Sequence, residues 1–185
     1  MRFALPLAFI VVLAACAPAV TRFDPAEGTR VFSLTIDGQA VPSAGGAFTY
    51  RSEPFDLDVT LRRDRLDIDL VNNTAATMRL IPDRSAIVLP DGSSSNVVTG
   101  TVSWTTRNDP QPTIVIPETA KASEVLLARS LLGFSSYSGL FIEPMFSWPL
   151  SSRVTIRLVL ALEVEGSERE VTLVFEGTPP PQPNP

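Results

Sequence analysis

Apolar residues at every second position are the feature that most constrains this chain. The longest run has apolar side chains at positions 154, 156, 158, 160, 162 and 164. After a turn at Glu165-Gly166-Ser167, Val171, Leu173 and Phe175 repeat the alternation. Successive side chains of a β-strand point to opposite faces, so this pattern predicts a C-terminal hairpin with one apolar face.

A second hairpin is predicted earlier in the chain. Phe55–Leu61 and Leu66–Leu70 each alternate apolar and acidic or polar residues, and the charged stretch 62–65 separates them. Aligning the apolar faces fixes the register. It pairs Leu61 with Leu66, Val59 with Ile68 and Leu57 with Leu70.

Shorter segments complete an all-β prediction. Turn residues at Asp37-Gly38, Asn72-Asn73 and Pro90-Asp91-Gly92 separate several of them, and no segment carries a convincing period of 3.6 residues. We therefore expect an antiparallel sandwich or barrel, with the sandwich preferred. The further strands are expected at residues 31–36, 47–50, 78–81, 86–89, 96–104, 113–116 and 124–129.

The N-terminus has the layout of an export signal. Arg2 precedes an apolar run from Phe3 to Leu13, which is shorter than the roughly 20 residues that span a bilayer. The run ends in Leu13-Ala14-Ala15-Cys16, which resembles the lipobox of bacterial lipoproteins. The resemblance implies lipidation of Cys16 and cleavage before it. An uncleaved anchor over residues 3–20 is the alternative, and prolines within that span disfavour it.

These features divide the chain into four parts. Residues 1–15 are expected to be the lipoprotein signal peptide, and 16–29 the lipidated N-terminus with a flexible spacer. Residues 30–177 are expected to form the sandwich, and the proline-rich segment 178–185 is expected to be a disordered tail. Cys16 is the single cysteine, so the sandwich must be stable without a disulfide.

A weaker resemblance concerns the domain itself. Leu66-Asp-Ile-Asp-Leu-Val-Asn-Asn-Thr74, Ser85-Ala-Ile-Val-Leu-Pro-Asp-Gly92 and Thr113-Ile-Val-Ile-Pro117 look like segments of the immunoglobulin-like accessory domains of bacterial envelope lipoproteins. This resemblance implies an immunoglobulin-like sandwich. The Cys-Trp-Cys core of true immunoglobulin domains is missing, so the strand order stays open.

The composition disfavours catalysis. The chain contains no histidine, which excludes a Ser-His-Asp triad, a Cys-His pair and a histidine-ligated zinc. Lys121 is the only lysine, and Glu118 stands where a Ser-x-x-Lys motif needs serine. Hydrolysis by paired carboxylates stays open. No basic patch with interleaved aromatic residues is present, so nucleic acid is not expected as a partner.

Two carboxylates suggest a candidate metal site. The register of the second hairpin places Asp58 opposite Asp69, and like charges directly across a pair of strands are destabilising. Either the strands do not pair in this way, or a positive charge lies beside them. Calcium would supply that charge, and nearby arginines on a solvated face are the alternative.

The other candidate site is the segment from Phe134 to Leu150. It is rich in aromatic and methionine side chains without a steady period, and glycine and prolines interrupt it, which predicts a long irregular connection. Phe146 and Trp148 are the candidate partner contacts in this segment. The alternative is that these rings close one end of the sandwich.

The expected function is a lipid-anchored cell-envelope protein that acts as a non-catalytic binding or structural module. Its partners would be the membrane, through lipidated Cys16, and another envelope protein, and no cofactor is expected. Ala17 follows the cysteine, and the lipoprotein resemblance then implies the periplasmic face of an outer membrane. A carbohydrate- or calcium-binding domain is the alternative, followed by a histidine-free hydrolase.

Overall fold

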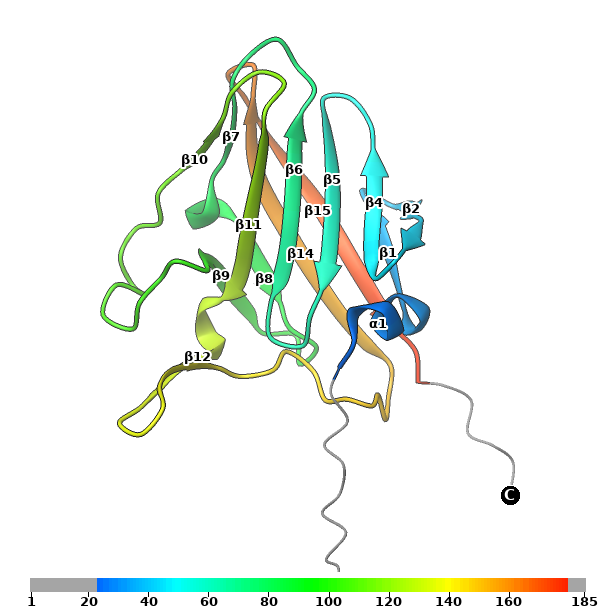
Figure 1. Ribbon diagram of the computed structural model, residues 1–185, viewed down its shortest axis with the longest axis vertical. Coiled ribbons are helices and arrows are strands. Elements are labelled where there is room, and N and C mark those ends of the chain that lie inside the picture. Colours follow the sequence, from blue (N-terminus) through cyan, green and yellow to red (C-terminus); the bar gives the residue numbers. More distant parts are fainter. Residues whose placement is uncertain (1–22, 180–185) are drawn as a thin grey trace, which may run out of the picture.

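The chain folds as a sandwich of two packed layers of antiparallel strands (Figure 1). The computed structural model describes residues 23–179. The predicted signal peptide, Cys16 and all but the first two residues of the predicted tail lie outside this range. Among the described residues, no helix has the length and apolar character needed to cross a membrane.

One layer is built around the predicted C-terminal hairpin, which is confirmed with Val164 paired to Ser167 and Val154 paired to Gly177. The order of strands is β2-β1-β15-β14, and β14 continues to both β8 and the β7–β10 pair. The strands of this layer are β1 (Phe32–Ile36), β2 (Gln39–Val41), β7 (Met78–Leu80), β8 (Ala86–Val88), β10 (Ile114–Ile116), β14 (Val154–Val164) and β15 (Ser167–Gly177).

The second layer contains the other predicted hairpin, with each apolar pair in the predicted register. Its order is β3-β4-β5-β6-β11-β9. Strand β9 also pairs with β8, so it joins the two layers along one edge. The strands are β3 (Ser43–Ala44), β4 (Ala47–Arg51), β5 (Phe55–Leu61), β6 (Leu66–Asn72), β9 (Ser94–Thr99) and β11 (Lys121–Ala128).

The core lies between the layers because each strand turns its apolar face inward. Every second residue of β5 and β6 is buried, and in Figure 1 β14 and β15 cross behind these strands. Phe48 of β4 contacts Phe175 of β15 edge to face, with ring centroids 5.8 Å apart. Contacts of this kind join the two layers into one hydrophobic core.

The predicted spacer is wrong over its last part. Pro25–Val31 form α1, a seven-residue helix, and the folded domain therefore begins before residue 30. The Asp24 side chain caps the helix by accepting a hydrogen bond from the Ala26 N–H at 2.9 Å, and Pro25 occupies the first turn. Two turns are too short to show a helical period, so only this capping pair signalled the helix.

The chain between β9 and β10 also differs from the prediction. A strand was expected through Trp104, but β9 ends at Thr99 because the Val102 N–H bonds back to the Thr99 carbonyl in a turn. Two short 3₁₀ segments, η1 (Pro82–Arg84) and η2 (Arg129–Leu131), lie on either side of this region in sequence.

The predicted irregular connection from Phe134 to Leu150 begins as regular structure. Strands β12 (Leu132–Ser135) and β13 (Gly139–Ile142) form a separate two-stranded hairpin, and irregular chain follows from residue 143 to β14. Figure 1 shows the tip of this hairpin extending away from the two layers.

Candidate functional site

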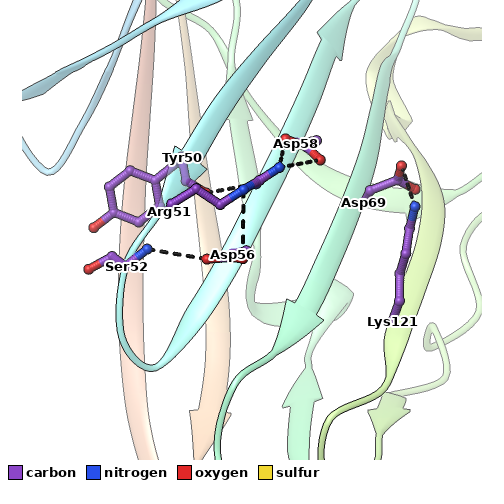
Figure 2. A network of polar contacts seen from close by, with 7 residues as sticks. All are labelled: Tyr50, Arg51, Ser52, Asp56, Asp58, Asp69 and Lys121. Atoms are coloured by element: carbon purple, nitrogen blue, oxygen red, sulfur yellow. Dashed lines mark hydrogen bonds and ion pairs between the residues drawn. The ribbon is translucent and has the colours of Figure 1, made fainter.

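The predicted juxtaposition of Asp58 and Asp69 is confirmed, because the two residues are directly paired between β5 and β6. Each carboxylate has its own cation, supplied by the next strand outward (Figure 2). The Arg51 Nη2 of β4 lies 3.0 Å from the Asp58 Oδ2, and the Lys121 Nζ of β11 lies 2.8 Å from the Asp69 Oδ2. Arg51 also lies 3.6 Å from Asp56.

The cations keep both carboxylates ionised. Desolvation raises the pKa of Asp58, but hydrogen bonds from Arg51 and Thr49 and the charge of Arg51 outweigh it, so the pKa lies below its ordinary value. Hydrogen bonds from Lys121 and Ser123 lower the pKa of Asp69. The Ser123 Oγ donates to the Asp69 Oδ1 at 2.6 Å.

This arrangement accounts for the like-charge pair without a metal ion. The sequence offered positively charged neighbours as the alternative to calcium, and such neighbours are found here. One of them is the expected arginine, Arg51, and the other is a lysine, Lys121. Within the described residues 23–179, no group of three or more Asp, Glu, His or Cys side chains is placed to hold a metal. A shallow depression of about 410 Å³ lies over this face and is lined by Asp58, Asp69 and Ser123 among others.

Glu124 has an unusual environment on the neighbouring strand. Burial raises the pKa of its carboxyl group. It is paired with Ile68, a core residue, whereas Ser123 is paired with Asp69 on the outer face. Since side chains alternate along a strand, the Glu124 side chain leaves β11 on the opposite side from the outward carboxylates.

Phe146 does not form the exposed contact that the sequence suggested, and Trp148 is only partly exposed. Phe146 is buried, and its ring contacts Phe32 and Phe23 at centroid distances of 5.1 Å and 5.4 Å. Trp148 is half-buried and meets Phe23 edge to face at 5.0 Å. The prediction of partner contacts is therefore wrong for Phe146, and these rings close one end of the sandwich.

The exposed aromatic surface lies instead on the β12–β13 hairpin. Five large apolar residues are exposed within the described chain, and four of them are on this hairpin. Tyr137 at the tip is fully exposed, and Phe134 is 52% exposed. We refer to these four residues as the hairpin patch: Phe134, Tyr137, Leu140 and Phe141.

The patch extends over both faces of the hairpin. Phe134 is paired with Leu140, and Gly133 is paired with Phe141. Residues 132, 134, 140 and 142 therefore share one face, and residues 133 and 141 share the other. The Phe141 ring covers Gly133, where any added Cβ would collide with it. Cross-strand packing of this kind holds the exposed ring in place.

The base of the hairpin is fixed to the sandwich. Leu132 is buried in a small cluster with Val98 of β9 and Leu127 of β11, on the outer side of these strands. Ile142 of β13 packs against the same cluster. This anchorage explains why β11 buries consecutive residues at its end, since one face meets the core and the other meets the hairpin.

A stack of side chains supports the patch from the β9–β10 connection. The Trp104 ring stacks on Phe134 with centroids 5.6 Å apart, and the Arg107 guanidinium lies 3.4 Å from the Trp104 ring centroid. Arg107 also donates a hydrogen bond to the Trp104 carbonyl. The indole is thus packed against both a cation and an aromatic ring.

Four exposed apolar residues lie in the predicted segment, but they are not the two residues that the sequence singled out. The signal that identifies the hairpin is Ser135-Ser-Tyr-Ser-Gly139, a run of turn-forming residues with apolar residues on either side.

The chain was compared with known proteins, and no family model, no curated protein and no solved structure matches it. The immunoglobulin-like strand order therefore stays a resemblance.

Proposed function

We propose that this protein is a lipid-anchored component of the bacterial cell envelope that acts by binding, and that the hairpin patch is its contact surface. The lipobox-like Leu13-Ala14-Ala15-Cys16 supports the anchor. The exposed patch is the observation that carries the binding role. By the lipoprotein resemblance, the periplasmic face of an outer membrane is the proposed location.

The distribution of apolar side chains supports a binding role for the hairpin. Elsewhere the domain buries its large apolar residues, and only Val115 outside the hairpin is comparably exposed in the described chain. Exposing a cluster of large apolar side chains is unfavourable in water, and such clusters mark contact sites. Leu132 and the Trp104 stack hold the hairpin in this exposed position.

The carboxylates give no support to the hydrolase alternative. A general acid needs a raised pKa beside a second, ionised carboxylate. Asp58 and Asp69 are both in ion pairs with a lowered pKa, and Asp67 pairs with Arg62 and Arg65. Glu124 has the raised pKa but points to the other side of its strand.

Photocrosslinking in intact cells tests the binding role. A photoreactive amino acid replaces Tyr137 at the hairpin tip. A matched variant carries it at Ser167, which is also exposed and is the first residue of β15, next to the β14–β15 turn at the opposite end of the sandwich. We expect adducts from position 137 well above those from position 167. Equal yields at the two positions would remove the hairpin patch as the contact surface.

A further inference from the structure

We propose that the hairpin patch is a second membrane contact, with its side chains inserted into the interface of the bilayer that holds the lipid anchor. This inference rests on the proposed function, since it requires the anchor at Cys16. The proposed partner of the hairpin is lipid.

The hairpin and the beginning of the described chain lie at the same end of the molecule. Figure 1 shows α1 and the β12–β13 hairpin at the lower end, with the β14–β15 turn at the upper end. Contacts agree with this view. Phe23, the first described residue, packs against Phe146 and Trp148, and the Met145 N–H bonds to the carbonyl of Arg63 in the β5–β6 turn.

The covalent distance between anchor and domain is short. Cys16 lies seven residues before Phe23, and seven residues span at most roughly 25 Å even when fully extended. An anchor on Cys16 therefore confines this end of the sandwich to the neighbourhood of the bilayer. Contact between the hairpin and the lipid then becomes intramolecular, which favours it even where the contact itself is weak.

The chemistry of the hairpin suits a lipid interface. Residues 132–142 contain no charged side chain, although the chain as a whole carries a net charge of −5. Aromatic residues concentrate where membranes meet water, because their rings are apolar and the tyrosine hydroxyl stays hydrated. Serines at positions 135, 136 and 138 supply small polar groups between the rings.

The two-sided arrangement of the patch favours lipid over a protein partner. Phe134 and Leu140 are exposed on one face, Phe141 on the other, and Tyr137 at the tip. A protein surface usually covers one face of a projecting element, whereas lipid surrounds all of it. A projecting hairpin with exposed apolar side chains on both faces and at its tip has the shape expected for insertion into a fluid interface.

The depth of insertion is limited by the backbone. Strands β12 and β13 pair only with each other in the described chain, so their outer edges carry unpaired N–H and C=O groups. Such groups are costly in the hydrocarbon core, where no water can satisfy them. We therefore expect the side chains to enter the headgroup and upper acyl region, as amphipathic interfacial elements do.

Fluorescence from a single labelled site tests the proposal. In the full lipidated protein the Cys16 sulfur is occupied, so Tyr137→Cys supplies the one reactive thiol for an environment-sensitive dye. Ser167→Cys is the matched control at the opposite end. Both proteins are reconstituted into phosphatidylethanolamine–phosphatidylglycerol vesicles, with and without lipids that carry a spin-label quencher near the headgroup.

We expect the dye at position 137 to shift to the blue and to be quenched several-fold more strongly than the dye at position 167. Since the hairpin is uncharged, this quenching should persist when salt is raised from about 0.05 to 0.5 M, unlike binding through basic residues. Equal, weak quenching at both positions in floating vesicles would overturn the membrane contact and leave a protein partner for the hairpin. Failure of the proteins to float with the vesicles would instead overturn the anchor itself.

Discussion

Asp58 of β5 and Asp69 of β6 face each other directly, and each is paired with a cation from the adjacent outer strand, Arg51 on one side and Lys121 on the other. Across four neighbouring strands the charges therefore run cation, carboxylate, carboxylate, cation (Figure 2). The arrangement turns an unfavourable like-charge pair into a row of ion pairs on the solvated face.

Replacing Lys121 by Met is expected to destabilise the domain by about 0.2–1 kcal/mol at pH 7, the range for exposed ion pairs. Lys121 lowers the pKa of Asp69, so its contribution is complete above the ordinary carboxyl pKa and is lost as the pH falls through the lowered value in the folded state. The difference between the variant and wild type should therefore be smaller at an acid pH well below the ordinary carboxyl pKa than at pH 7. Urea unfolding at both pH values measures it, and Lys121→Arg should restore most of the loss. An equal loss at both pH values would contradict the ion-pair explanation.

Glu124→Gln is expected to stabilise the domain at neutral pH. Burial raises the pKa of Glu124, so the ionised form is disfavoured in the folded state and costs stability above that pKa. Below about pH 3 the carboxyl group is protonated in both states, and the gain should vanish. Thermal unfolding across this range measures the effect. A variant that is less stable than wild type at neutral pH would show that Glu124 makes a favourable contact as a carboxylate.

A cavity made in the core at β14 should lower the free energy of unfolding. Leu158 is completely buried between the layers, and Leu158→Ala is expected to cost about 2–5 kcal/mol. Thr155 lies exposed on the same strand, and Thr155→Ala is the matched control, with an expected change within about 0.5 kcal/mol. Similar losses for both variants would mean that the faces of β14 are assigned wrongly.

Phe146 and Trp148, at the end of the sandwich, should contribute differently to the stability of the domain. Phe146→Ala is expected to cost about 3–5 kcal/mol because the ring is buried. Trp148 is half-buried against Phe23, so Trp148→Ala is expected to cost less than Phe146→Ala while still lowering Tm measurably. Chemical unfolding of the two variants ranks them. An unchanged Tm for Trp148→Ala would mean that its ring does not close the sandwich.

The strand pairing was predictable where a strand has one apolar face and one polar face. The alternation in Phe55–Leu61 and Leu66–Leu70 fixed the register of that hairpin, down to the pairing of Asp58 with Asp69, because a shift by one residue would have exposed every apolar side chain. The C-terminal hairpin was predictable for the same reason. Helix α1 was not, since its stability comes from Phe23 and the Asp24 cap more than from any repeating pattern.

The candidate site was only partly predictable. Apolar side chains in 134–150 could be found in the sequence, but which of them are buried depends on Phe23 and Phe32, which lie more than a hundred residues earlier in the chain. Long-range packing decides that Phe146 is core and Tyr137 is surface. The sources of the two cations beside Asp58 and Asp69 likewise depend on strand order, since Lys121 comes from a distant segment.

The anchor is tested by Cys16→Ser. The substitution should abolish incorporation of a labelled fatty acid and release the protein from the membrane fraction. Retention of the unlabelled variant in membranes would indicate that the N-terminal segment spans the bilayer as an uncleaved anchor.

The most direct measurement of the hairpin's role uses the two tyrosines of the chain, Tyr50 and Tyr137, as probe and internal control. Tyr137 is fully exposed, and Tyr50 is half-buried on β4, away from the hairpin. Hydroxyl-radical footprinting with mass spectrometry compares the oxidation of both residues in the purified protein and in intact cell envelopes. If the hairpin patch is the contact surface, Tyr137 oxidises faster than Tyr50 in solution and becomes protected in envelopes, while Tyr50 changes little. Equal oxidation of Tyr137 in solution and in envelopes would contradict the proposal.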